Sequence, residues 1–139
     1  FLKKELHLFS KNNKKIEFDI HIEKNIGKLE VDKVQFRQVI DNLINNAIKF
    51  ADKNDPKISF SAEKANKNVC IKIEDNWKGF QDTDISSIFD KYFTGETSGI
   101  WIGIGLYLCK KIVEFHDGKI EAKFSKKLWW GKFVITIPK

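Results

Sequence analysis

Three polar residues have the types and spacing of a site for a metal ion and a phosphate. Asn42, Asn46 and Lys49 follow one another at intervals of four and three residues, so on a helix they share one face. An asparagine oxygen can bind a hard cation such as Mg²⁺, and a lysine one turn further on can hold a phosphate. An ordinary solvated helix face explains the same three residues, and their spacing alone leaves both readings open.

Two features further along the chain could complete such a site. Asp75 follows an alternating apolar segment and precedes an Asn-Trp-Lys-Gly sequence. A carboxylate there can accept a hydrogen bond from an exocyclic amine such as that of adenine, although a common Asp–Asn turn is an alternative. Gly99, Gly103 and Gly105 precede an apolar helical segment, and glycines at a helix N-terminus let backbone amides approach an anion. The sequence contains neither a Walker A loop nor a Rossmann fingerprint.

Hydrophobic periodicity predicts the helices and strands that must position these residues. Phe36, Ile40, Leu43 and Ala47 recur at intervals of three or four and predict a helix over 34–51. Their stripe lies well over about 90° from the asparagines, so core packing does not explain the latter. We expect further helices over 1–9 and 103–116 and strands over 16–22, 57–62, 69–74, 119–124 and 132–137. The economical arrangement is an α+β two-layer sandwich, with helices on one face of a mixed, mostly antiparallel sheet.

Length and composition predict one domain over 1–139 and exclude several classes. Hydrophobic residues make up 42% and charged residues 32% of the 139 residues, a globular balance. No apolar run approaches the roughly 20 residues of a membrane span and no signal peptide opens the chain, so we expect a cytoplasmic domain without membrane contact. Cys70 and Cys109 are too few for a zinc cluster and are expected to pack as small hydrophobes.

The net charge of +6 fits nucleic acid, an acidic partner or a phosphate ligand equally well. Lysines such as those at 11, 14 and 15 are dispersed without the interleaved aromatic residues that a base-stacking surface requires. We therefore expect no nucleic-acid partner.

Four segments in order resemble the ATP-binding catalytic domain of a sensor histidine kinase, a branch of the GHKL superfamily. Residues 38–50 resemble the N box, 74–80 the first glycine box, 88–93 the F box, and 101–116 the second glycine box with its helix. The resemblance covers essentially the whole chain and implies the α/β sandwich of that family, with a lid over 94–102.

The resemblance also implies roles for individual residues and two ligands, ATP and Mg²⁺. Asn46 would ligate Mg²⁺ and, with Lys49, serve catalysis, while Asn42 would support the site. Phe50 would lie near the adenine and Asp75 would accept a hydrogen bond from its amine. The remaining nucleotide-binding residues would be Gly79, Lys91, Gly103, Gly105 and Leu106.

The reaction implied is transfer of the γ-phosphoryl group to a histidine in two-component signalling. ATPase relatives carry a glutamate four residues before the metal asparagine, where this chain has Asn42, which cannot accept a proton. Asp41 projects about 100° away around the helix. The implied partners are a phosphoacceptor histidine domain, in the same parent chain or a dimer partner, and a response regulator. None of His7, His21 and His116 resembles the acceptor box, so we expect surface or element-end histidines there.

Four tryptophans depart from the family pattern. Trp77, Trp101, Trp129 and Trp130 stand where the family carries glycine or is glycine-rich, and a tryptophan at a position with positive φ costs on the order of 1–3 kcal/mol. One alternative is therefore a degenerate module that binds nucleotide weakly or binds only a partner. Another is that these positions are glycines misread from recoded UGA codons, and a third function is an anti-sigma-type serine kinase.

Overall fold

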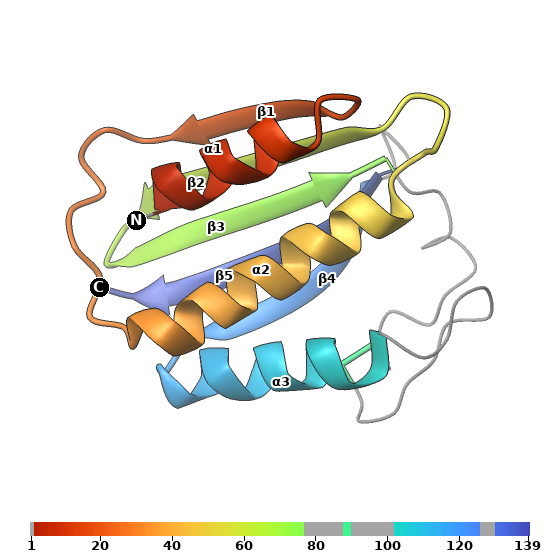
Figure 1. Cartoon of the computed structure of the whole chain (residues 1–139). Coiled ribbons are helices and arrows are strands. Elements are labelled where there is room, and N and C mark those ends of the chain that lie inside the picture. Colours follow the sequence, from red (N-terminus) through yellow and green to blue (C-terminus); the bar gives the residue numbers. More distant parts are fainter. Residues whose placement is uncertain (1, 77–87, 90–101, 126–129) are drawn as a thin grey trace.

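The computed structural model describes residues 2–76, 88–89, 102–125 and 130–139, which form one layer of helices over one sheet (Figure 1). The helices are α1 (Leu2–Asn12), α2 (Lys33–Phe50) and α3 (Ile102–Phe115). The strands are β1 (Glu17–Ile22), β2 (Lys57–Ala65), β3 (Asn68–Asp75), β4 (Lys119–Ser125) and β5 (Trp130–Pro138).

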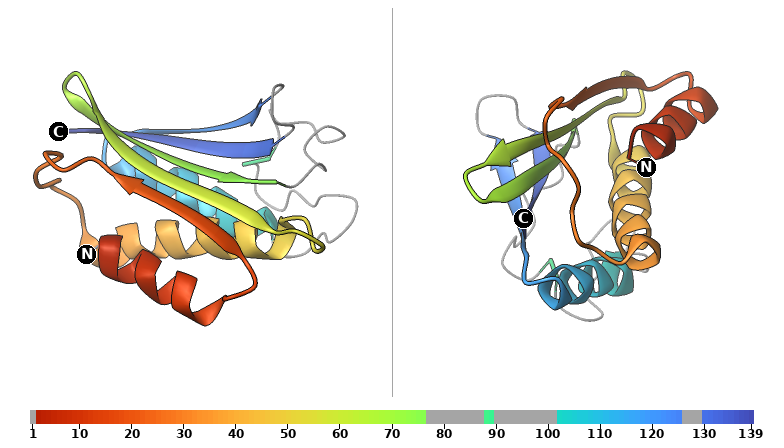
Figure 2. Two further views of the ribbon diagram at one scale, coloured as in Figure 1. Left: turned by 90° about the horizontal axis from the view of Figure 1, so that it is seen from above. Right: turned by 90° about the vertical axis from the view of Figure 1, so that its left-hand side faces the viewer.

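The sheet has five strands in the order β1-β2-β3-β5-β4. β1 pairs with β2 in parallel, whereas the other three pairs are antiparallel. All three helices lie on the same side of the sheet (Figure 2). The predicted α+β sandwich with a mixed, mostly antiparallel sheet is therefore confirmed.

The strands are longer than their apolar alternation predicts because hydrogen-bonded pairing extends into polar residues. β2 continues three residues beyond the expected end at Ala62, since Glu63, Lys64 and Ala65 pair with the start of β3. The hairpin turns at Asn66, which has φ +58°. Asparagine tolerates this left-handed conformation better than most residues, and the turn thereby fixes the β2–β3 register.

The start of α2 is fixed by an aspartate cap. The carboxylate of Asp32 accepts hydrogen bonds from the backbone N–H groups of Val34 and Gln35, at 3.0 and 3.1 Å. The backbone N–H of Asp32 donates to Nε2 of His116, at 3.0 Å. His116 also bonds the Ile112 carbonyl through Nδ1, so it joins the end of α3 to the start of α2. This agrees with the prediction of an element-end histidine.

The end of α3 is a Schellman motif. The N–H of Gly118 donates to the carbonyl of Val113 and that of Asp117 donates to Glu114, the pairing that defines this cap. Asp117, with φ +58°, takes the left-handed position that glycine usually fills. Gly118 is required for space instead, since a Cβ there would lie 2.7 Å from the Thr136 carbonyl oxygen. The predicted stop signal is confirmed, with this division of roles between the two residues.

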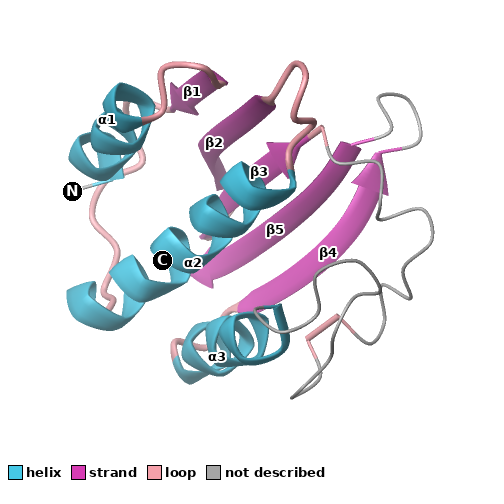
Figure 3. Ribbon diagram, turned by 45° about the vertical axis from the view of Figure 1, so that its right-hand side comes forward, coloured by secondary structure: helices cyan, strands magenta, loops and turns pink. Residues whose placement is uncertain are grey.

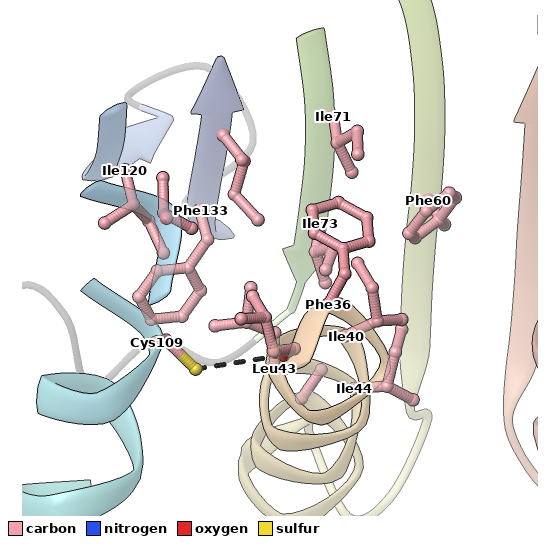
Figure 4. Packing of buried hydrophobic residues seen from close by; sticks show 14 of the residues in the cluster. Phe36, Ile40, Leu43, Ile44, Phe60, Ile71, Ile73, Cys109, Ile120 and Phe133 are labelled. Atoms are coloured by element: carbon pink, nitrogen blue, oxygen red, sulfur yellow. Dashed lines mark hydrogen bonds between the residues drawn. The ribbon is translucent and has the colours of Figure 1, made fainter. Parts of the chain in front are cut away.

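The core lies between the inward face of the sheet and the buried sides of α2 and α3 (Figure 4). Phe36, Ile40 and Leu43 of α2 pack with Ile73 and Phe133 of the central strands. Their side chains are at most 5% exposed. This packing holds the polar face of α2 turned toward α3.

Candidate functional site

The ends of three secondary-structure elements meet at one edge of the molecule. The last turns of α2, the end of β3 and the first turn of α3 lie together there (Figures 1 and 3). α2 packs against both α3 and β3. The described residues among those that the sequence singled out lie on these three elements.

Asn42 lies against α3 at Gly105. A Cβ built on Gly105 would be 4.0 Å from Cγ of Asn42, which is ordinary contact distance. The absence of a side chain at Gly105 thus leaves the Asn42 amide open toward the first turn of α3. One helical turn further along α3, Cys109 also hydrogen-bonds the Asn42 side chain. The structure therefore joins two predicted site residues from segments over sixty positions apart.

Cys109 packs as a small hydrophobe, as predicted, and its thiol also hydrogen-bonds α2. Its side chain is fully buried, and its thiol donates to the backbone carbonyl of Val39 at 3.8 Å (Figure 4). Burial raises the pKa of the Cys109 thiol to about 12, against a smaller lowering by its hydrogen bond with Asn42. The thiol therefore stays protonated and links α3 to α2. Cys70, by contrast, is only half-buried.

Asn46 and Lys49 complete the polar face of α2. Asn46 is half-buried, yet no hydrogen bond joins its side chain to another residue in the described parts of the chain. Lys49 is exposed, and its Nζ lies 5.5 Å from the ring centroid of Phe50, within the range of a cation–π contact. Phe50 itself is half-buried and packs against the core. A half-buried amide without a partner is suited to an added ligand.

Asp75 is the last residue of β3 and is only 5% exposed. It is the one charged residue with a buried side chain in the described parts of the chain. It pairs with Ile58 of β2 and Gly131 of β5, so its backbone is held on both sides. A buried carboxylate is costly unless it is hydrogen-bonded. An ordinary Asp–Asn turn does not require the carboxylate to be buried, so the turn alone does not explain Asp75.

Asn76 is a site-building residue that the sequence reasoning missed. Its Oδ1 accepts from the backbone N–H groups of Asp52 and Lys57, at 3.0 and 3.1 Å, and its Nδ2 donates to the Asp55 carbonyl at 2.7 Å. Because Asp52 closely follows Phe50, these bonds hold the end of α2 beside the end of β3. The Asp-Asn dipeptide was visible in the sequence, but its three distant partners were not.

The first turn of α3 contains Gly103 and no acidic residue. The first backbone N–H groups of a helix lack intrahelical partners and attract anions. Gly103 lies among these groups, and its contact with a phosphate stays a prediction. In a helix that begins at Ile102, the N–H groups of Gly105 and Leu106 come within reach of intrahelical carbonyls. Leu106 is also buried in the core. Amide contacts from these two residues stay a prediction.

Several predicted features lie outside the described residues. These are Gly79, Lys91, Trp77, Trp101, Trp129 and the predicted lid over 94–102, except that its last residue, Ile102, begins α3. Trp130 is described only as the first residue of β5, paired with Ser125.

Asp41 faces away from the predicted metal ligand. Its surroundings are Glu5 of α1 and Arg37 of α2, and Arg37 forms an ion pair with Glu5 at 3.5 Å. Asp41 is therefore directed toward α1, whereas Asn42 faces α3. This supports the inference that Asp41 cannot replace the missing general base.

The donor set fits Mg²⁺ only if a ligand shares the coordination. The described residues contain no group of three or more His, Cys, Asp or Glu side chains able to hold a metal ion. Mg²⁺ keeps several waters and is usually bound through one or two protein groups together with phosphates. The unpartnered amide of Asn46 suits that arrangement.

Comparison with known proteins gives consistent matches. Residues 31–139 match the family described as "Histidine kinase-, DNA gyrase B-, and HSP90-like ATPase". The chain is 34% identical over 134 residues to the sensor protein KdpD of Clostridium acetobutylicum, covering 94% of this chain and 15% of that protein. It is 34% identical over 134 residues to the adaptive-response sensory kinase SasA of Synechocystis, covering 94% of this chain and 34% of that protein.

A solved structure agrees with the sequence matches. The catalytic domain of the histidine kinase ThkA, in a nucleotide-free form, superposes with a TM-score of 0.84 at 28% identity, covering 99% of this chain and 89% of that one. The curated relatives are longer proteins, since the chain spans 15 to 34% of the length of four that it matches. No helix in the described parts of the chain is both long and apolar enough to cross a membrane.

Proposed function

We propose that the chain binds Mg–ATP at the edge where α2, β3 and α3 meet. The chain belongs to the family of histidine kinase-, DNA gyrase B- and HSP90-like ATPases. It matches the ATP-binding catalytic domain of sensor histidine kinases. We further propose that it transfers the γ-phosphoryl group to a histidine of a phosphoacceptor domain, and that a response regulator receives the group next.

One observation carries the proposal. The half-buried Asn46 amide has no hydrogen-bond partner among the described residues and lies one helical turn from Asn42. Asn42 lies beside Gly105 near the start of α3, where the absence of a Cβ leaves space next to its amide. Two side-chain amides thus lie beside the N-terminal part of a helix. This pairing suits a phosphate chain with its bound cation.

Each residue has a distinct part in the proposed reaction. The buried carboxylate of Asp75 accepts a hydrogen bond from the adenine amine, and the Phe50 ring packs near the base. Lys49 and the first turn of α3 balance phosphate charge, Asn42 orients the phosphates, and Asn46 would hold Mg²⁺. When bound, Mg²⁺ supplies further neutralisation of the charge on the phosphates. Phosphoryl transfer depends mainly on such positioning and electrostatic stabilisation.

The same residues favour transfer over hydrolysis. Asn42 occupies the position at which the ATPase relatives carry a basic glutamate, and an amide does not accept a proton from water. Asp41 faces α1. The proposed activity therefore requires an acceptor histidine from outside the described residues.

Calorimetric titration with a non-hydrolysable ATP analogue tests the binding site. We expect Mg²⁺-dependent binding in the micromolar to submillimolar range for the chain as written. Asp75→Asn should weaken it by about tenfold to a hundredfold, because a charged hydrogen bond contributes about 1.5–3 kcal/mol. Glu74→Gln, at the neighbouring half-buried position, is the matched control and should bind as the unaltered chain does. Equal affinities for all three proteins would refute the assignment of Asp75.

A degenerate module is the second candidate, and the four tryptophans are its specific support. It predicts that the folded chain binds no nucleotide. Restoring glycine at the four positions then separates two explanations: recovered binding indicates misread glycines, and continued absence of binding indicates a partner-binding module. A phosphoacceptor helix pair in the parent chain would exclude the anti-sigma-type serine kinase.

A further inference from the structure

A hollow lies at the end of the molecule away from the proposed nucleotide site. It has a volume of about 560 Å³, within the range of small-molecule sites. Its floor consists of Phe36, Ala62 and Val69, whose side chains are at most 2% exposed. The other apolar residues that line it are half-buried: Ile22, Ile26, Leu29 and Val31.

The connection between β1 and α2 crosses this hollow and is hydrogen-bonded only at its ends. At the first end, Glu23 N–H donates to the Ala62 carbonyl at 3.0 Å, and Lys64 N–H donates to Glu23 Oε2 at 2.7 Å. At the other end, Asp32 N–H donates to His116. A hydrogen-bonded turn at Lys24 and Asn25 follows the first end. Within the described structure no hydrogen bond involves residues 27–31, and residues 24–31 are here called the strap. The strap is therefore held over the hollow by apolar contacts.

The rim of the hollow is basic. Lys3, Lys24, Lys28 and Lys33 line it, and Glu23 is the one acidic residue in its lining. No ion pair joins these four lysines to another residue that the structure describes. The Glu23 carboxylate already accepts the Lys64 amide. The free charge around an apolar interior is thus positive.

We propose that this hollow binds a free fatty acid, with its alkyl chain among the half-buried apolar residues of the lining and its carboxylate among the rim lysines. These apolar residues have no polar side-chain atoms, and an alkyl chain needs no hydrogen-bond partner there. The basic rim disfavours cations and gives an anionic head group its electrostatic partner.

The hollow is separate from the proposed nucleotide site. Phe36, on its floor, precedes Asn46 by ten residues of α2, which is about 15 Å along the helix. Figure 1 shows the strap and the end of β3 at opposite ends of the sheet. Fatty-acid binding therefore does not depend on the nucleotide function.

Titration of the chain with monomeric dodecanoate, followed by two-dimensional NMR, tests the proposal. We expect saturable one-to-one binding, with the largest shifts at the strap, Ala62 and Val69. Lys24→Glu combined with Lys28→Glu should weaken binding about tenfold. The control combines Lys14→Glu with Lys15→Glu, which changes the net charge equally at the other end of β1, and it should alter the affinity less than twofold.

Three further measurements make the outcome decisive. Leu29→Asn should weaken binding several-fold because it places a polar amide in the apolar lining, and dodecanol should bind more weakly than dodecanoate. Non-saturable binding, or equal weakening by the two lysine pairs, would overturn the proposal. Binding to vesicles of anionic phospholipid without binding to free dodecanoate would also overturn it, in favour of a membrane surface. Because nucleotide binding is measured separately, its loss or retention leaves this result unaffected.

Discussion

The two ends of α2 use polar side chains in opposite ways. At the N-terminal end the protein supplies most of the partners: Asp32 accepts two backbone amides and donates its own N–H to His116, and Arg37 pairs with Glu5. The exception there is Gln35 Oε1, which is buried without a partner among the described residues. At the C-terminal end the half-buried Asn46 has no partner among the described residues.

The difference separates residues that build the fold from residues that we propose bind a ligand. A polar group that is hydrogen-bonded within the protein stabilises the fold, and its loss lowers stability. A polar group without such a partner contributes little to folding, and its loss affects binding. Substitutions at the two ends should therefore have separable effects on stability and on function.

The largest expected effect is at the C-terminal end of α2. Asn46→Asp should lower phosphoryl transfer to the acceptor domain by about a hundredfold or more, because it places a negative charge beside the phosphates. The free energy of unfolding should change by less than about 0.5 kcal/mol. The measurement is single-turnover transfer from ATP in a parent kinase that carries the substitution. Asn45→Asp, at the adjacent exposed position, is the control, and normal transfer by Asn46→Asp would refute the metal assignment.

Asn76 should affect both stability and binding, since its side chain is hydrogen-bonded within the protein yet lies beside the proposed nucleotide site. Asn76→Ala removes three hydrogen bonds and should lower the free energy of unfolding by about 2–3 kcal/mol. Urea denaturation measures this effect, and nucleotide affinity should fall as well. Asn54→Ala, at an exposed position in the same loop, should have little effect on either quantity. Unchanged stability in Asn76→Ala would show that the loop is held by other contacts.

The cap at the N-terminal end of α2 should affect stability alone. Asp32→Ala removes the acceptor of two backbone N–H groups and should cost about 1 kcal/mol. Asp32→Asn keeps an acceptor and should recover most of this loss. Thermal denaturation of the two variants, together with nucleotide titration at a temperature where both are folded, checks the prediction. A changed nucleotide affinity in Asp32→Ala would mean that the two ends of α2 are coupled.

The smallest expected effect is at Asp41, whose charged form is disfavoured by its surroundings in the folded chain. Burial raises the pKa of Asp41, the charge of Glu5 and its hydrogen bond raise it further, and Arg37 lowers it. The folded chain therefore binds this proton more tightly than the unfolded chain. Its contribution to stability is complete below the ordinary pKa of 3.8 and is lost as the pH rises through the raised value.

Asp41→Asn should therefore raise the free energy of unfolding at pH 7, by about 0.5 kcal/mol once solvent screening is allowed for. Denaturation curves measured from pH 4 to pH 7 provide the test. The gain should shrink toward pH 4, and an equal gain at every pH would mean that charge at Asp41 is not its cause.

Much of this arrangement was predictable from local sequence. Periodicity located every helix and strand of the described chain, because apolar residues must recur with the helical or strand period to share one buried face. The end of α3 was marked by Asp117 and Gly118 for an equally local reason. The predicted stripe of Asn42, Asn46 and Lys49 followed from helix geometry, and the order of four sequence boxes indicated the family.

The contacts that join distant segments were decided only by the tertiary structure. Asn76 bonds a loop about twenty residues earlier, Cys109 bonds Val39 across 70 positions, and His116 bonds Asp32 across 84. No local pattern encodes such partners, because they depend on the strand order and on the packing of α3 beside α2. The sequence by itself thus determined which residues share one face of a helix or strand, through periods of a few residues. Long-range packing decided which of their polar atoms the protein satisfies and which it leaves open.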